Sequence, residues 1–398
     1  MRSHILSIAL LIAAFPAQGA LAARGPASVY DYQEDAEGMT KCVRLAIPNG
    51  MAVVRGIMVS TNGAGGDTRD AYRQPWHEEF LDLHDFAFIG TKAFTSHKES
   101  FDVLINALKR FAQESRHPEL VHAPFVTVGF SAGGGFASRL VNEAPERVIA
   151  AAPCSTYLRA EPTPTVLSTP ICLISGELEP RLTEGLAAVV NAYRPKGALL
   201  SWMTVQGLPH QWAGQHTLAM PFLDAAVRLR YTADQDPRNG PVRLAAIPAS
   251  RGWIADNTSW KEGLTRIYPP GKFKGDIARS SWLLNDDIAF IYRAYATYDN
   301  PLRIVSPVGI DQKGQVLDAG ANVTIAVDAT RFPKWKRLEF FDGARSLGEV
   351  RKAPAQLTAR GLAAGFHVFS VLGTNAKRQV RSSGPVLIVV RKPPGGGR

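Results

Sequence analysis

The sequence of 398 residues predicts a mostly parallel α/β domain followed by an all-β domain. Between residues 40 and 231, short apolar runs typical of buried strands alternate with amphipathic helical patterns, which implies a parallel sheet with helices on both faces. After residue 300, short strands separated by turn residues follow one another without a helix, which predicts an antiparallel sandwich. At roughly 150 residues per domain, the length agrees with two or three domains.

The α/β domain is organised around residues 124–136, where a short apolar run ends at a Gly-x-Ser-x-Gly motif and a helical pattern follows. A serine at the tip of such a strand–turn–helix junction is held in a strained backbone conformation that exposes its Oγ. Gly129 and Gly133 flank it because a Cβ at either place would collide with the neighbouring strand or helix. Ser131 is therefore a candidate nucleophile; the alternative is an ordinary serine in a glycine-rich connection.

The other elements of this domain are predicted from apolar periodicity and turn residues. Two early strands, 40–47 and 51–60, are joined by Pro48-Asn49-Gly50 and lead into a glycine-rich loop at 61–67. Further strands are expected at 86–90, 148–152, 170–175 and 199–205, and helices at 76–84, 100–114, 182–193 and 217–231. Ser131, Glu179 and His210 each follow a strand end, where ligands bind in sheets of this kind.

A serine hydroxyl needs a base to remove its proton and a third group to orient that base. Of the nine histidines, only His210 follows the Ser131 strand, comes directly after a strand end and lies in a Gly/Pro loop. His216 is the second choice, and a surface histidine without a catalytic role is the alternative for His210. Glu177 and Glu179 both lie in the loop after the preceding strand; Glu179 is the favoured acid because it lies farther from the strand end.

A developing oxyanion needs two N–H donors that are already aimed at it. The N–H of Ala132, directly behind the serine, is predicted to be one. The second is expected from the loop at 62–66, from Ala64 or Gly63. No cofactor is needed for this chemistry, and no Cys/His spacing suggests a metal site.

Residues 40 to about 231 resemble an α/β-hydrolase through three segments, the elbow at 129–133, the acid loop at 176–179 and the loop at 207–210. The chain order Ser131, Glu179, His210 is also the one found in that superfamily. The resemblance is closest to secreted bacterial esterases of the feruloyl-esterase and polyhydroxybutyrate-depolymerase type. It implies a serine esterase that cleaves small or polymer-linked carboxylic esters through an acyl-enzyme. Those enzymes usually carry Asp where this chain has Glu179, and His-Gly where it has Asn62-Gly63.

The sequence is also compatible with two other functions. One is a peptidase of the prolyl-oligopeptidase-like kind, although the large N-terminal propeller of such enzymes is missing. The other is a non-catalytic envelope-binding or adhesion protein that reuses a hydrolase body.

Residues 234–299 are interpreted as an extension packed on the hydrolase body, so that the whole domain covers 28–299. It contains a loop-like stretch at 251–260 and helical periodicity at 288–298. Trp253 or Trp260 either lines a substrate cleft or anchors the extension to the body, and we favour the anchor.

Residues 300–392 are expected to form the second domain, with strands at 304–307, 323–327, 337–343, 366–371 and 385–390. They resemble bacterial Ig-like modules through Ser306-Pro307 and the segments 340–343, 365–367 and 383–386. From Arg331 onward there are 14 Lys or Arg and 3 Asp or Glu, so this segment carries a net charge of +11 and the rest of the chain about −1. The excess favours an anionic surface as partner, although a solvated cationic face is the simpler explanation. Residues 393–398 are expected to form a flexible tail.

The N-terminus is predicted to be a signal peptide over residues 1–22, with a polar start, an apolar run at 5–15 and Ala20-Leu21-Ala22 before the cleavage site. The protein is therefore expected to be secreted or periplasmic, with no transmembrane segment after signal removal and no nucleic acid as partner. Of the three cysteines, Cys172 lies in an apolar strand and should be a buried, inert thiol. An odd number leaves at least one thiol free, and a bridge between two of Cys42, Cys154 and Cys172 remains open.

Overall fold

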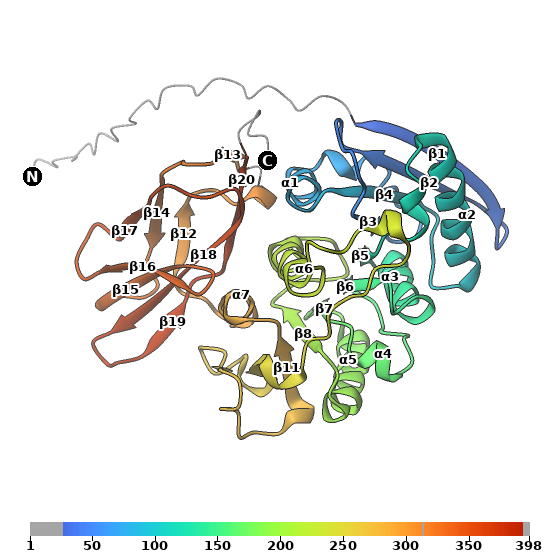
Figure 1. Ribbon diagram of the computed structural model, residues 1–398. Coiled ribbons are helices and arrows are strands. Elements are labelled where there is room, and N and C mark those ends of the chain that lie inside the picture. Colours follow the sequence, from blue (N-terminus) through green and yellow to red (C-terminus); the bar gives the residue numbers. More distant parts are fainter. Residues whose placement is uncertain (1–26, 313, 393–398) are drawn as a thin grey trace, which may run out of the picture.

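The computed structural model describes residues 27–312 and 314–392. The predicted signal peptide and the predicted tail lie outside these residues. Figure 1 shows an α/β body and a separate β module beside it, joined through α7. Among the described residues, no helix has the length and apolar character needed to cross a membrane.

The body contains an eight-stranded sheet in the order β1-β2-β4-β3-β5-β6-β7-β8. Its strands are β1 (Ser28–Ala36), β2 (Met39–Ile47), β3 (Gly56–Thr61), β4 (Phe86–Lys92), β5 (Phe125–Phe130), β6 (Val148–Cys154), β7 (Ile171–Gly176) and β8 (Leu200–Val205). Neighbouring strands from β4 to β8 pair in parallel, whereas β1 and β2 are antiparallel to their neighbours. The residues of β3, β5 and β6 are all buried, as expected for strands covered on both faces.

Helices cover both faces of this sheet (Figure 1). Helices α1 and α6 lie on the face toward the β module, and α2, α3 and α5 lie on the opposite face. Their bounds are α1 (Pro75–His84), α2 (Lys98–Ser115), α3 (Ala132–Glu143), α4 (Pro164–Leu167), α5 (Pro180–Tyr193) and α6 (His216–Arg230). The predicted helices of the body are confirmed to within about two residues at either end, and the four-residue α4 was not predicted.

The N-terminal strands differ from the prediction. Strand β3 begins at Gly56 rather than at residue 51, and its first residue packs so closely that a Cβ there would lie 2.3 Å from the ring of Phe86. Strand β1 was missed altogether. It is an edge strand with largely exposed, polar side chains, and it is recognised only through its pairing along its whole length with β2.

The extension forms a small sheet of its own in the order β10-β9-β11, followed by a helix. The elements are β9 (Trp253–Asp256), β10 (Ile267–Tyr268), β11 (Ser280–Leu283) and α7 (Asp286–Ala296). The stretch predicted to be a loop therefore contains β9. Trp260 packs on Trp202 of β8 at 5.0 Å between ring centroids and donates to the Tyr292 hydroxyl at 3.3 Å, while Trp253 packs on Phe290. Trp260 therefore anchors the extension to the body, whereas the contact of Trp253 lies within the extension.

The C-terminal module is an Ig-like β-sandwich of two sheets, in the orders β12-β14-β17 and β13-β20-β18-β15-β16, with β19 on β18. Its strands are β12 (Arg303–Ser306), β13 (Leu317–Asp318), β14 (Val323–Asp328), β15 (Trp335–Asp342), β16 (Arg345–Val350), β17 (Gln356–Ala359), β18 (Gly365–Asn375), β19 (Val380–Ser382) and β20 (Val386–Arg391). Leu338, Phe340, Phe369 and Val371 fill the space between the sheets. The module is antiparallel as predicted except for β13 and β20, which pair in parallel.

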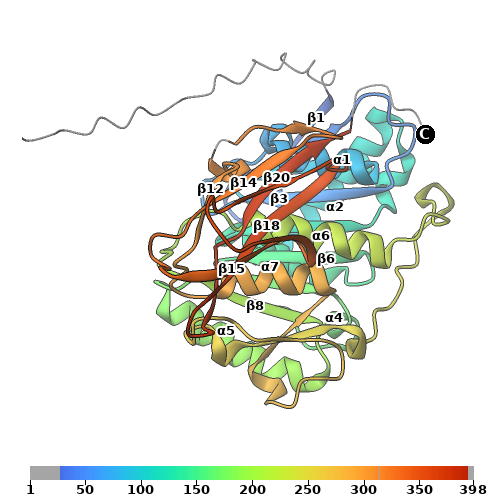
Figure 2. The same cartoon turned by 90° about the vertical axis from the view of Figure 1, so that its left-hand side faces the viewer.

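The module is docked on the body rather than tethered to it (Figure 2). Val368, Leu387 and Val389 of β18 and β20 belong to the same apolar core as the body. Asp287 of α7 accepts a hydrogen bond of 2.8 Å from the N–H of Ala344, and Arg391 forms an ion pair with Glu78 of α1. Since α1 and α6 lie between the module and the sheet, this docking leaves the carboxyl ends of the strands open.

Candidate functional site

Ser131 lies at the sharp turn between β5 and α3, with φ +55° and ψ −120°. A non-glycine residue in this region is strained, as expected of a residue that presents its hydroxyl at the end of a strand. The flanking glycines are required sterically. A Cβ on Gly129 would lie 2.4 Å from the Gly133 carbonyl oxygen, and a Cβ on Gly133 would lie 2.5 Å from the carbonyl oxygen of Asn62.

Three of the predicted site residues lie within hydrogen-bonding distance of one another. His210, in the loop after β8, has Nε2 at 2.8 Å from Ser131 Oγ and Nδ1 at 2.5 Å from Oε1 of Glu179. The imidazole rests against the ring of Phe130, at 4.9 Å between centroids, and half of its side chain is exposed. With Nδ1–H donating to the carboxylate, Nε2 is left as the acceptor that faces the serine hydroxyl.

The two candidate acids have different partners. Glu179 is 8% exposed, and its second oxygen accepts hydrogen bonds from Ser155 Oγ at 2.8 Å and from the N–H of Gly176 at 2.7 Å. Glu177 points elsewhere: it accepts from the N–H of Gly207 at 3.0 Å and lies 3.5 Å from Lys261. Glu179 is therefore the carboxylate that contacts His210.

The chain combines this strand order, the sharp turn at Ser131 and the order serine, acid, histidine along the sequence. This is the α/β-hydrolase fold.

His216, the second choice as base, does not face Ser131. It is the first residue of α6, and its ring stacks on Trp76 at 4.3 Å between centroids. Burial lowers the pKa of His216 to about 4, and neither ring nitrogen has a hydrogen-bond partner. It borders a separate cavity of about 690 Å³ between α1 and α6.

The two predicted oxyanion donors differ in how free their N–H groups are. Ala132 is the first residue of α3, so its N–H has no partner within the helix. Gly63 lies beside the nucleophile, since a Cβ there would be 3.3 Å from Ser131 Cβ. Its N–H, however, donates to Oδ1 of Asn62 at 2.7 Å. Of the two candidates for the second donor, Gly63 is thus engaged with the neighbouring side chain, and Ala64 follows it in the same loop.

A cavity of about 640 Å³ opens above Ser131. Its walls come from the loops that follow β4, β5, β6, β7 and β8, at the carboxyl ends of the strands. Besides the three residues above, the lining includes Ser96, Tyr157, Arg159, Arg181 and Leu182, and it includes neither Trp253 nor Trp260. The sequence analysis missed Ser155, Arg159 and Arg181 because loop residues carry no periodic signal. Their position after predicted strand ends was the available clue.

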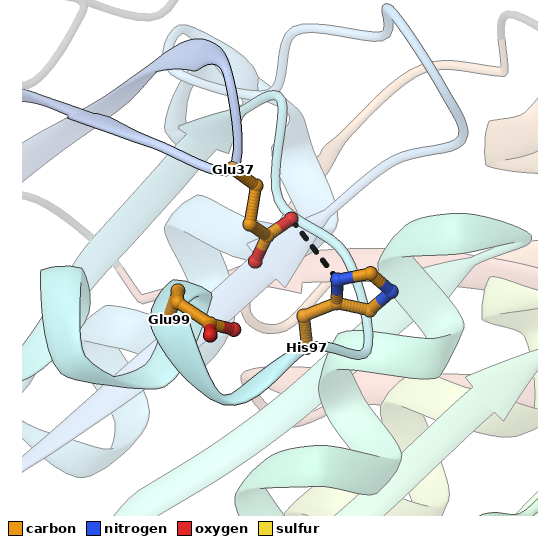
Figure 3. Close-up of side chains that lie close together, drawn as sticks. All are labelled: Glu37, His97 and Glu99. Carbon is orange, nitrogen blue, oxygen red and sulfur yellow. Dashed lines mark ion pairs between the residues drawn. The ribbon is translucent and has the colours of Figure 1, made fainter.

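Glu37, His97 and Glu99 come together beside this cavity, and His97 also lines it (Figure 3). One potential ligand atom from each lies within 4.8 Å of the others. The fully buried Lys41 already lies 3.2 Å from Oε2 of Glu37, and Thr95 Oγ1 donates to the same oxygen at 3.0 Å. Because an ammonium ion compensates this carboxylate, we assign the group a structural part in holding the loop at 95–97.

No family model matches the chain, and no curated protein matches it in sequence. Among solved structures, a poly(3-hydroxybutyrate) depolymerase from Bordetella parapertussis is 18% identical, with 50% of this chain and 88% of that chain covered and a TM-score of 0.36. A thermostable esterase is 14% identical, with 46% and 55% covered and a TM-score of 0.37. Fibronectin(III)-like modules of CbhA from Clostridium thermocellum are 20% identical, with 23% and 94% covered and a TM-score of 0.21. The fold assignment rests on the strand order and the elbow, since each TM-score is below 0.5.

Proposed function

We propose that this protein is a serine hydrolase that cleaves carboxylic esters through an acyl-enzyme on Ser131. The observation that carries the proposal is the pair of hydrogen bonds that His210 makes, 2.8 Å to the Ser131 hydroxyl and 2.5 Å to Glu179. A serine so placed is activated by an adjacent base, and the base is held in one tautomer by the carboxylate.

In the first step, Ser131 Oγ attacks the carbonyl carbon while Nε2 of His210 takes the hydroxyl proton. His210 then returns this proton to the leaving alcohol, and the acyl group remains on Ser131 as an ester. In the second step, His210 takes a proton from water, whose oxygen attacks the acyl-enzyme. The carboxylic acid leaves, and the proton on His210 returns to Ser131. Glu179 stabilises the imidazolium that forms in both steps.

Each step passes through a tetrahedral oxyanion, and in this proposal the N–H of Ala132, the first residue of α3, binds it. The loop at 62–66 supplies the second donor in this proposal. For Gly63 to serve, the Asn62 side chain has to rotate away and release the N–H that it now binds. Ala64 is the donor if that side chain stays in place.

The test is hydrolysis of p-nitrophenyl butyrate by the wild-type protein and by Ser131→Ala. We expect the variant to lose kcat by a factor of about 10⁴ or more, because removal of the nucleophile leaves only the oxyanion donors and binding. Ser168→Ala, at the C-terminal end of α4 and outside the cavity lining, is the matched control and should retain the wild-type rate. A Ser131→Ala protein as active as the wild type would refute the proposal.

Two further measurements separate the rival functions. A fluorophosphonate probe should label one serine per chain in the wild type and none in Ser131→Ala. Well-folded wild-type protein that is not labelled would favour a non-catalytic binding role. Peptide amides assayed beside the short acyl esters would show whether the protein is instead a peptidase.

We further propose that the protein is exported and that the signal peptide is removed after Ala22. This proposal is supported by the polar start, the apolar run and the small residues within the first 22 positions. N-terminal sequencing of protein recovered outside the cytoplasm should begin at Ala23. A chain that keeps Met1 and stays in the cytoplasm would refute export.

A further inference from the structure

We infer that the substrate carries an anionic group, such as a carboxylate, which Arg159 and Arg181 bind beside Ser131. This inference rests on the proposed function, because it concerns the substrate of the same site. Both arginines line the cavity of about 640 Å³ that contains Ser131, Glu179 and His210.

The topology of the sheet sets the two arginines beside the reacting serine. Arg159 belongs to the loop after β6, the strand next to β5 and its elbow. Arg181 is the second residue of α5, directly after the loop that bears Glu179. Both therefore come from the carboxyl ends of strands between the one that leads to Ser131 and the one that leads to His210.

Neither guanidinium is neutralised by a carboxylate. Arg159 donates to Ser96 Oγ at 3.2 Å, and among the described residues neither Arg159 nor Arg181 forms an ion pair. Some other arginines of the body do form ion pairs, such as Arg44–Asp31, Arg139–Glu143 and Arg266–Asp256. Two unpaired cations in one concave site raise the local concentration of anions.

The acidic groups around the cavity do not cancel this charge. Glu179 is the acidic residue in the lining; it is buried, and His210, Ser155 and the Gly176 N–H occupy its oxygens. Glu37, behind the loop at 95–97, is compensated by the buried ammonium of Lys41. Among the residues that line the cavity, Arg159 and Arg181 are therefore the exposed charged groups without an ionic partner.

Arginine fits this role chemically. Its planar fork of N–H donors can bind two oxygens of a carboxylate at once, and it stays protonated at every pH at which the reaction is measured. Arg159 and Arg181 act here as specificity-determining residues. They bind the charged end of the substrate, while Ser131, His210 and Glu179 act at the ester.

The experiment compares esters that are similar in size and shape and differ in charge. For the acyl side, mono-p-nitrophenyl adipate is compared with its neutral methyl ester. For the alcohol side, p-carboxyphenyl butyrate is compared with p-carbamoylphenyl butyrate. In at least one pair, we expect the wild type to have a kcat/KM at least about tenfold higher for the anionic member, because hydrogen bonds to charged groups contribute at this level.

The substitutions Arg159→Gln and Arg181→Gln test the two residues. We expect each to lower the ratio of kcat/KM between the anionic and the neutral ester several-fold, and the double variant to abolish the preference. The ratio is unaffected by the fraction of folded protein. Arg360→Gln, an exposed arginine of the β module, removes the same charge far from the cavity and should leave the ratio within twofold.

The outcomes separate this inference from the proposed function. If the wild type hydrolyses neutral esters through Ser131 but shows no anionic preference in either pair, the inference is wrong and the esterase proposal stands. An equal loss of preference in Arg360→Gln would also overturn it, because the effect would then come from net charge. If no ester is hydrolysed and no probe labels Ser131, the proposed function itself fails.

Discussion

The Ser155 hydroxyl donates a hydrogen bond of 2.8 Å to Oε2 of Glu179, the carboxylate oxygen that His210 does not contact. Ser155 has φ +46°, a strained value for a residue with a side chain, and it immediately follows β6. Such strain persists only where the surrounding structure enforces it. Together with the Gly176 N–H, Ser155 fixes the carboxylate so that its other oxygen faces the imidazole.

Glu179→Gln should lower kcat by about 10³- to 10⁴-fold with little change in KM. The amide cannot stabilise the imidazolium, and it allows the wrong tautomer of His210. Steady-state hydrolysis of p-nitrophenyl butyrate measures the effect. Glu177→Gln is the matched control two residues away, and we expect it to change kcat less than threefold, since Glu177 bonds the Gly207 N–H and Lys261 instead. Reversed effects of the two variants would show that Glu177 is the acid.

Gly133→Ala should damage both stability and turnover. The added methyl would lie 2.5 Å from the Asn62 carbonyl oxygen and 2.6 Å from its nitrogen, so the loop that carries Gly63 has to move. Overpacking of this kind costs about 1–3 kcal/mol. Thermal unfolding should therefore shift down by several degrees, and kcat should fall at least about tenfold. Gly384→Ala, whose methyl would meet its nearest atom at 3.9 Å, should behave like the wild type in both assays.

The thiols should react unequally. All three cysteines are free, and Cys154 and Cys172 are buried while Cys42 is partly exposed. Burial raises the pKa of Cys172 to about 12 and that of Cys154 well above its usual value, so neither supplies thiolate near pH 8. Titration with Ellman's reagent should detect one thiol in the folded protein and three in denaturant. Cys42→Ser should reduce the first number to zero, and a fast second thiol in the folded protein would contradict the assignment.

Stability should fall as the pH is lowered from about 6.5 to about 4. Burial lowers the pKa of both His77 and His216 to about 4. The unfolded chain takes up protons on these side chains below its own histidine pKa of about 6.5, whereas the folded protein does not, so the free energy of unfolding decreases in this window. Each histidine contributes on the order of 3 kcal/mol to the change. Urea unfolding at pH 7, 5.5 and 4.5 measures it.

His216→Phe should flatten that pH dependence by about half. Phenylalanine retains a flat ring to stack on Trp76 but cannot be protonated. An unchanged slope of unfolding free energy against pH would show that His216 is protonated in the folded state.

Much of the site was predictable because its signals are local. The elbow is a contiguous strand–turn–helix pattern, and Glu179 and His210 each follow an apolar strand run. In a parallel sheet the carboxyl ends of the strands share one edge, so residues 79 positions apart, such as Ser131 and His210, could be expected to meet. Strand β1 was missed because most of its side chains are polar or exposed, and it is recognised as a strand only through its pairing with β2.

The sequence by itself determined the alternation of strands and helices from β2 to α6, apart from the short α4, and the elbow at Ser131. Only the tertiary structure decided that Glu179 rather than Glu177 contacts His210, that Asn62 engages the N–H of Gly63, and that Arg159 and Arg181 share a cavity without an acidic partner. The physical reason is that backbone periodicity follows from neighbouring residues, whereas the direction of a loop side chain depends on which distant groups satisfy its hydrogen bonds.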